Sequence, residues 1–195
     1  MDDRTLAFYD GNAAEYADFA TESAEHPKLA AFAARLPDGA RVLDFGCGVG
    51  WAAAALRDMG HTVDALDASA GLAEEAKKRY DLDLKVAHFK TLSRRARYDA
   101  IWSHYALQHA DREDRADILQ RIHTALRPGG LLYIGVQKGP RDWRDDLGRL
   151  YTPFREEEMT NLLQQTGFTD WEITHGTGTN YDGTPSLNLT VWARA

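Results

Sequence analysis

Short apolar runs alternate with amphipathic stretches along the chain from Arg41 onward. Such runs predict buried strands, and apolar residues at helical spacing predict the helices that cover them. This alternation is typical of repeated β-α units and a parallel sheet. It predicts strands at 41–45, 61–66, 84–87 and 98–102, a helix at 51–59 that Gly60 ends, and a helix to Tyr80 that Ser69 caps.

The second half of the chain continues this pattern. Asp111 is placed to cap the next helix, which Pro128-Gly129-Gly130 ends. Thr152-Pro153 predicts another helix, closed by Gly167, because proline is favoured at the first helical position. The remaining apolar runs predict strands at 131–136, 168–174 and 187–193, and the turn-rich link at 175–185 favours an antiparallel pair.

The region before Arg41 has helical patterns at 6–19 and 29–36, but these precede the first strand. We expect residues 1–38 to form an N-terminal helical cover over the open end of the sheet. Residues 39–195 are then a Rossmann-like α/β core with helices on both faces. There is no internal repeat or linker, so 1–195 is predicted to be a single domain.

Composition narrows the class of protein. The formal net charge is −7, and the densest basic stretch, Arg94-Arg95-Ala96-Arg97, is short, which argues against a bulk nucleic acid substrate. No apolar run approaches the roughly 20 residues of a membrane-spanning helix, and the N-terminus has no signal-peptide pattern. The single cysteine, Cys47, fits a reducing compartment, so we expect a cytoplasmic protein.

Glycines at 46, 48 and 50 follow the first strand, where they allow a tight turn and close approach of the backbone to a ligand. A helix-start turn without a ligand is the alternative. The acidic Asp44 before the loop would repel pyrophosphate and attract an ammonium group. Asp67 closes the second strand, placed to accept hydrogen bonds from ribose hydroxyls. The pattern favours S-adenosylmethionine over NAD, although either aspartate could serve as a loop or cap residue.

At this point the chain resembles the class I S-adenosylmethionine-dependent methyltransferases. The resemblance rests on four segments: 42–50 (VLDFGCGVG), 63–69 (VDALDAS), 98–109 (YDAIWSHYALQH) and 126–132 (LRPGGLL). It implies a seven-stranded, mostly parallel sheet whose last strand is antiparallel. It also implies S-adenosylmethionine as cofactor and S-adenosylhomocysteine as product.

The resemblance also implies a set of cofactor-binding residues. The glycine loop meets the methionine moiety, Asp67 holds the ribose, and Ala68 lies beside the adenine. A tyrosine of the helical lid often reaches the methionine carboxylate in relatives. The sequence departs from the family at His88, where an acidic residue often meets the adenine, and at Trp51, where a small or acidic residue is common. The full set is Tyr9, Tyr16, Asp44, Phe45, Gly46, Cys47, Gly48, Trp51, Asp67, Ala68, His88, Phe89, Ser103 and His104.

His104 is the candidate catalytic base, because relatives place substrate-facing groups at the end of the fourth strand; a packing role is the alternative. His109 is expected to order the start of the following helix. No metal-binding constellation is present in the sequence. Four residues of the segment 138–151 could receive an acidic or aromatic substrate, or form a solvated loop: Arg141, Trp143, Arg144 and Arg149.

Four functions are consistent with this pattern. Methyl transfer to a small molecule is favoured, and transfer to tRNA or a protein side chain is the alternative enzyme. A regulatory module that binds S-adenosylmethionine without turnover belongs to a different class, and a nicotinamide dehydrogenase comes last. The oligomeric state is left open, because aromatic residues of the cover could serve an interface or a substrate.

Overall fold

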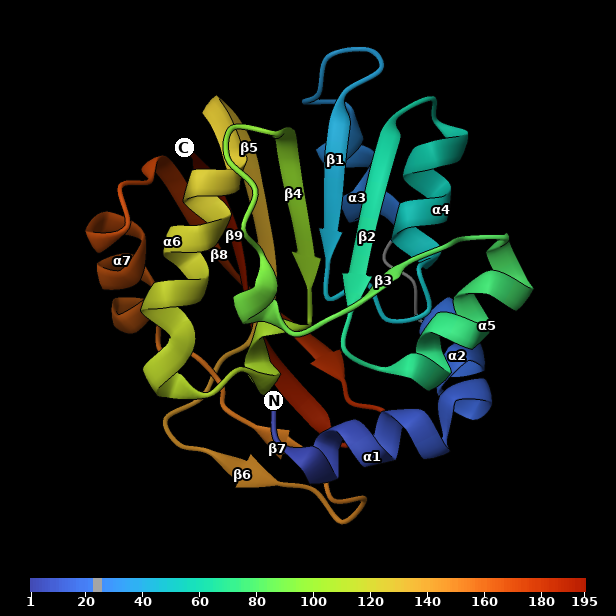
Figure 1. Ribbon diagram of the computed structural model, residues 1–195. Helices are drawn as coiled ribbons and strands as arrows, with labels where there is room; N and C mark the ends of the chain where they lie inside the picture. The colour runs from blue at the N-terminus through green and yellow to red at the C-terminus, as the bar shows by residue number, and fades with distance from the viewer. Residues whose placement is uncertain (23–25) are drawn as a thin grey trace.

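The computed structural model describes residues 1–22 and 26–195 and has a seven-stranded sheet at its centre (Figure 1). The strand order is β3-β2-β1-β4-β5-β9-β8. Strands β1 to β5 are parallel, and β9 is antiparallel to both of its neighbours, as expected. The strands are β1 (Arg41–Phe45), β2 (Thr62–Asp67), β3 (Lys85–Val86), β4 (Tyr98–His104), β5 (Leu126–Gln137), β8 (Thr169–Thr179) and β9 (Pro185–Arg194), with a separate pair β6 (Trp143–Arg144) and β7 (Leu150–Tyr151).

Helices cover both faces of the sheet, because successive residues of a strand point to opposite faces. Val42 of β1 packs in a core cluster with residues of α3 and α4, whereas Leu43 packs with residues of α6 and α7. The two-sided arrangement is confirmed (Figure 1). These helices are α3 (His26–Ala33), α4 (Trp51–Asp58), α5 (Ala70–Tyr80), α6 (Arg115–Ala125) and α7 (Glu156–Gln165), and the short 3-10 turns are η1 (Phe89–Thr91), η2 (Leu107–His109) and η3 (Arg112–Asp114).

The N-terminal helices take two different positions. Helices α1 (Asp3–Gly11) and α2 (Ala13–Glu22) lie at the carboxyl end of the sheet, whereas α3 packs on a sheet face (Figure 1). There the rings of Phe32 and Trp102 have centroids 5.2 Å apart. The helix predicted at 6–19 is divided at Asn12, whose side chain donates a hydrogen bond to the Phe8 carbonyl (2.9 Å) and so ends α1.

Several predicted boundaries are wrong, most of them because a distant contact prevails over a local signal. Asp111 does not cap α6, which begins at Arg115 after the η3 turn. The following strand begins at Leu126 rather than at residue 131, because Leu126 pairs with Tyr98 of β4. The link expected at 175–185 is largely strand, since β8 and β9 pair as far as Thr179 and Pro185 and leave only 180–184 as the turn.

The helix expected from Thr152-Pro153 begins at Glu156. The Thr152 backbone N–H donates to the Gln108 carbonyl (2.7 Å), and its hydroxyl donates to the Ala110 carbonyl (2.7 Å). These bonds hold Thr152 beside η2, and the helix begins only after it. The Glu158 carboxylate instead accepts from the Arg155 backbone N–H at the helix start (3.4 Å).

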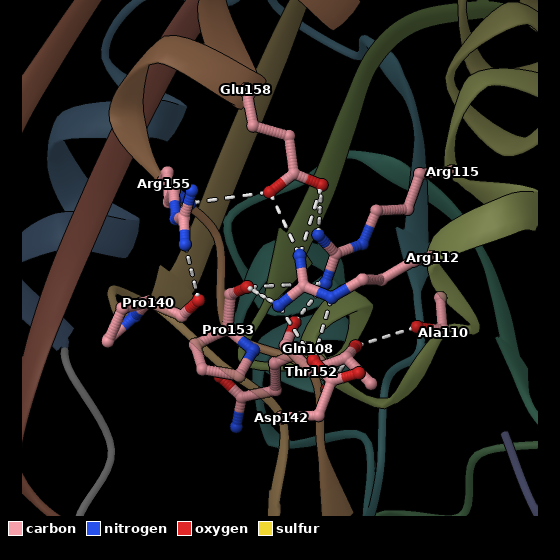
Figure 2. Close-up of polar contacts among 10 residues, drawn as sticks. All are labelled: Gln108, Ala110, Arg112, Arg115, Pro140, Asp142, Thr152, Pro153, Arg155 and Glu158. Carbon is pink, nitrogen blue, oxygen red and sulfur yellow. Dashed lines mark hydrogen bonds and ion pairs between the residues drawn. The ribbon is translucent and has the colours of Figure 1, made fainter.

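A buried arginine ties this connection to α6 (Figure 2). The guanidinium of Arg115 donates to the Glu158 carboxylate and to the Thr152 carbonyl, and it lies 3.6 Å from the ring centre of Phe154. Arg112 supports the same carboxylate (3.1 Å). The segment between β5 and α7 is therefore fixed against the carboxyl end of β4. No helix of the described residues is long and apolar enough to cross a membrane.

Replacing Arg115 with methionine keeps much of the apolar stem but leaves the buried Thr152 carbonyl without its charged donor. We expect Arg115→Met to lower the free energy of unfolding by about 2–3 kcal/mol, measured by urea denaturation. Arg155→Met is the matched control, because the Arg155 side chain is exposed and bonds only the Pro140 carbonyl (2.9 Å); it should cost less than about 0.5 kcal/mol. Equal losses would contradict a special role for the buried arginine.

Candidate active site

A cavity of about 500 Å³ lies at the carboxyl ends of β1, β2, β4 and β5, beneath α1 and α2. Parallel strands bring their carboxyl ends to one edge of a sheet, where ligands of open α/β folds bind. One side, which we call the loop half, is lined by Gly46–Gly48, Asp67, Ala68, His88 and Phe89. The other side, the hairpin half, is lined by Gln137, Arg149, Tyr151, Asn180, Tyr181 and Asn188.

Two positions of the glycine loop need glycine, and they need it for different reasons. Gly46 has φ of +77°, and a Cβ there would overlap with the side chain of Ala106. Gly48 has φ of +56°, but a Cβ there would meet nothing within 4 Å. Gly46 is therefore required by the packing of the protein itself, whereas Gly48 presents bare backbone to open space in the cavity. That is the cradle expected for a ligand that approaches the main chain.

Asp67 organises the loop half. Its carboxylate accepts the backbone N–H of Gly48 (2.8 Å) and the backbone N–H of Ser69 (3.0 Å). Burial raises the pKa of Asp67 above its usual value, while these N–H groups act in the opposite direction. The side chain is thus oriented by two loops at once, and it lines the cavity.

Charges around the cavity are paired, with one exception. Lys90 lies 2.8 Å from Asp114, and the Met1 amino group lies 3.7 Å from Asp111. Arg149 lies 2.7 Å from Asp145. Several charged side chains of the described residues line the cavity. Of these, only Asp67 has no oppositely charged group within ion-pair distance. The cavity therefore offers one uncompensated negative charge, located in the loop half.

Most of the predicted site residues line this cavity, and three do not. The lining includes Tyr9, Tyr16, Gly46, Cys47, Gly48, Trp51, Asp67, Ala68, His88, Phe89 and His104. Asp44, Phe45 and Ser103 lie beneath it. Ser103 is fully buried and donates to the Phe45 carbonyl (2.9 Å), which ties β4 to β1. The Phe45 ring packs against Phe89, with centroids 5.0 Å apart.

Asp44 has the environment of a capping residue. Its carboxyl is buried and hydrogen bonded to the backbone of Ala53 in the first turn of α4. One oxygen, Oδ2, has no hydrogen-bond partner. Burial raises the pKa of Asp44 to about 8, so the carboxyl is largely protonated at neutral pH. In this structure it supports the start of α4 below the glycine loop.

His104 lines the cavity from the end of β4. Its ring is stacked on Trp102 (centroids 5.2 Å apart), and Nδ1 lies 3.3 Å from the Tyr133 hydroxyl. Burial lowers the pKa of His104 to about 3. The imidazole is therefore neutral at physiological pH and has little affinity for a proton.

His109 is a lining residue that sequence reasoning placed only at a helix start. Its Nδ1 lies 2.7 Å from the Leu150 carbonyl, an acceptor, so Nδ1 carries the proton. Nε2 then accepts from the Tyr9 hydroxyl (3.0 Å). This bond joins η2 to the helical cover. No local motif predicts it, because the contact joins residues 100 positions apart.

The sequence did not predict most residues of the hairpin half. The sequence groups Arg149 with other charged residues of a loop that could be solvated. In the structure the Arg149 side chain is buried, at 2% exposure. Tyr151, Tyr181 and Asn188 carried no sequence signal. They come from β7, the hairpin turn and β9, which the sheet order brings to the side of the cavity away from the glycine loop.

The burial of His109 makes stability depend on pH. Burial lowers its pKa to about 4, below the unfolded value near 6.5, so only the unfolded state gains a proton as pH falls below 6.5. This contribution to stability is present above pH 6.5 and is lost as pH falls toward 4. From pH 7 to 5 it amounts to about 2 kcal/mol, at 1.36 kcal/mol per pH unit below 6.5.

We therefore expect the free energy of unfolding of His109→Gln to fall by about 2 kcal/mol less than that of the wild type over this pH range. Urea denaturation at pH 7 and 5 measures the difference. An unchanged dependence in His109→Gln would show that His109 does not titrate in this way.

Comparisons with known proteins agree with the geometry. A family model described as a methyltransferase domain matches residues 16–173. A ubiquinone biosynthesis O-methyltransferase of Methylocella silvestris is 31% identical over 189 residues, covering 77% of this chain and 72% of the relative. A malonyl-[acyl-carrier protein] O-methyltransferase of Enterobacter lignolyticus is 41% identical over 106 residues. That match covers 52% of this chain, and the chain spans only 41% of the relative.

A solved structure of similar fold is the 1,6-didemethyltoxoflavin-N1-methyltransferase of Burkholderia thailandensis, with bound 1,6-didemethyltoxoflavin and S-adenosylhomocysteine. It has a TM-score of 0.78 and 26% identity, and the match covers 98% of this chain and 87% of that chain. The family match, the sheet order and the glycine loop together show that the chain belongs to the methyltransferase domain family, in its class I S-adenosylmethionine-dependent form.

Proposed function

We propose that this protein binds S-adenosylmethionine in the loop half of the cavity and transfers its methyl group to a small molecule in the hairpin half. The observation that carries the proposal is the uncompensated negative charge of Asp67 in a cavity whose other charged side chains are paired. The cofactor has a sulfonium, an ammonium and a carboxylate, so it brings one net positive charge. NAD, with its pyrophosphate, would add negative charge beside Asp67.

The residues of the loop half fit this cofactor. The open face of Gly48 suits the methionine moiety, and the Asp67 carboxylate suits the ribose hydroxyls. Ala68, His88 and Phe89 supply a mostly apolar surface for the adenine. The lid tyrosines, Tyr9 and Tyr16, face the same cavity from α1 and α2. The Burkholderia relative, solved with S-adenosylhomocysteine, supports this assignment.

The bound cofactor supplies an electrophilic methyl group, and the protein holds the acceptor and the cofactor in position. Methyl transfer needs the lone pair of the acceptor in line with the bond to sulfur, and fixed geometry lowers that barrier substantially. Residues of α1 and α2 line the cavity, a position from which a helical cover can limit the access of water to a reaction. His104 is a weak base with a pKa of about 3. We propose that it shapes the cavity as a neutral ring, and that the acceptor attacks through a lone pair it already has. The bond from the methyl carbon to sulfur would break as the bond to the acceptor forms, and any proton on the attacking atom would be lost to solvent.

A small acceptor is favoured over a polymer by the position of the cover. Helices α1 and α2 and the turn at 180–184 lie over the cavity, where Phe19 and Tyr181 pack with ring centroids 5.1 Å apart. The relatives named above act on small molecules or on a carrier-bound group, by their names. The free Cys47 thiol is buried, and we place the reaction in the reducing cytoplasm.

Calorimetric titration with S-adenosylmethionine, S-adenosylhomocysteine and NAD tests the cofactor assignment. We expect the first two to bind and NAD to be silent. Asp67→Ala should weaken S-adenosylhomocysteine binding by about 1.5–3 kcal/mol, the usual loss for a hydrogen bond to a charged group. Asp83→Ala is the control, because the Asp83 side chain is 86% exposed, and its affinity should equal that of the wild type. Unchanged affinity in Asp67→Ala would move the ribose site elsewhere.

The two glycines allow a second test of the same site. Gly48→Ala should fold with a loss of about 1 kcal/mol, because only its positive φ is strained, yet it should bind S-adenosylhomocysteine poorly. Gly46→Ala should lose more stability, since its Cβ overlaps with Ala106. Thermal melts and titrations of both variants measure these effects. Full affinity in Gly48→Ala would contradict close approach of the cofactor.

Turnover distinguishes the remaining functions. Release of S-adenosylhomocysteine with a metabolite extract, but not with tRNA or a protein extract, is the expected result. Methylation of tRNA or protein alone would overturn the small-molecule acceptor. Binding of the cofactor with no turnover on any extract would favour a regulatory module.

A further inference from the structure

One wall of the loop half runs from Asp67 to a second carboxylate at the rim of the cavity. The Ala87 backbone N–H donates to the Asp67 carbonyl (2.7 Å), so the segment after β3 begins beside Asp67. The wall continues through residues 88–90, which all line the cavity. At its far end the Lys90 ammonium lies 2.8 Å from the carboxylate of Asp114, the last residue of η3. The wall therefore has an acidic group at each end.

Asp114 has one oxygen engaged and one available. Its Oδ1 accepts from the Lys90 ammonium (2.8 Å), whereas Oδ2 has no hydrogen-bond partner among the described residues. The side chain is 22% exposed and lines the cavity, so a ligand can reach this oxygen. Asp114 precedes α6, but its side chain makes no capping hydrogen bond to that helix. It is thus an oriented acceptor that the fold itself leaves unused.

The ion pair with Lys90 limits the kind of ligand group that suits this oxygen. A carboxylate accepts hydrogen bonds and cannot donate them, so Oδ2 of Asp114 requires a donor. Because Lys90 already neutralises the carboxylate, an uncharged N–H group can donate to it without adding charge to the cavity. Phe89 of η1 and Ile118 of α6 add apolar lining. A flat, mostly apolar ring with an uncharged amine at its edge fits this environment.

The adenine of the proposed cofactor is such a ring. In the proposed site the ribose lies at Asp67 and the adenine extends along residues 88–89. The 6-amino group lies at the end of the purine remote from the ribose, has two N–H donors and carries no charge. The three residues from Ala87 to Lys90 span at most about 11 Å of chain, which is comparable to the length of a nucleoside. An adenine along this wall can therefore place its amine at Asp114.

We propose that Oδ2 of Asp114 accepts a hydrogen bond from the 6-amino group of the cofactor, and that this bond selects adenine over purines without the amine. The inference rests on the proposed function, because it adds a specificity-determining residue to that same cofactor site. It places the acceptor for the amine on η3 rather than at His88, directly after β3. No local motif predicts it, because the Lys90–Asp114 contact joins residues 24 positions apart.

Calorimetric titration with S-adenosylhomocysteine and with its 6-deamino analogue, in which hydrogen replaces the amine, tests this contact. The wild type should bind S-adenosylhomocysteine about tenfold or more tightly than the analogue, the ratio that corresponds to one hydrogen bond to a charged group. Asp114→Ala should bind the two ligands equally, with the affinity for the analogue unchanged. That unchanged affinity also shows that the variant is folded. Equal affinities in the wild type, or a preference that Asp114→Ala retains, would overturn the proposal.

Glu113→Ala is the matched control, because it removes the same charge from the same turn, and Glu113 is exposed and does not line the cavity. It should keep the wild-type preference, and a loss of preference there would show a general charge effect and refute the contact. His88→Leu and Asp111→Ala remove the competing acceptors of the cavity lining and should also keep the preference. A selective loss in either of these variants would assign the amine to that residue and overturn the role of Asp114.

The two ligands separate this inference from the proposed function. Tight binding of S-adenosylhomocysteine without preference over the analogue would reject the contact with Asp114 and retain the cofactor site. Binding of neither ligand would reject the cofactor assignment, and the amine contact with it.

Discussion

The carboxylate of Asp67 is the constraint on which the cavity depends. By accepting N–H groups from the loop after β1 and from the start of α5, it fixes two strand ends relative to each other. Ser69, one of those donors, also caps α5 and donates its hydroxyl to Asp10 of α1 (2.6 Å). The glycine loop, the helix and the cover are thus connected through one acidic group. The negative charge needed to order the loop is the same charge that the cavity presents to a ligand.

The two halves of the cavity arise from different parts of the fold. The loop half is built by the β-α units, where each strand end and helix start are neighbours in sequence. The hairpin half is built by β9, the turn at 180–184 and the segment after β5, which are held together by long-range contacts. Arg115 and Glu158 fix that segment, and Gln137 and Asn180 fix the turn. On the proposed assignment of the two halves, acceptor selection can therefore change through the hairpin without disturbing the cofactor site.

The same division explains what the sequence could predict. Strand β1, the glycine loop and the Ser69 cap follow from local signals, and each agrees with the structure. The long β8–β9 hairpin and the late start of α7 depend on partners elsewhere in the chain, so periodicity alone misplaced them. The sequence could not predict, for the same reason, that Arg149 and Asn188 are buried beside the cavity. From the sequence, an arginine in a charged segment is expected to be exposed. Only the fold shows that Asp145 and the cavity lie beside it.

The charge balance of the cavity bears on which form of the proposed cofactor binds more tightly. The Arg149–Asp145 pair has no net charge, and His104 and His109 are held neutral by burial. On the proposed assignment, Asp67 faces a cofactor with one net positive charge, and that cofactor becomes neutral when the methyl group leaves. On that assignment Asp67 attracts the methylated cofactor more strongly than the neutral product, which favours exchange of the product for fresh cofactor. A neutral acceptor takes up the positive charge together with the methyl group, and it returns to neutrality when it loses a proton to solvent.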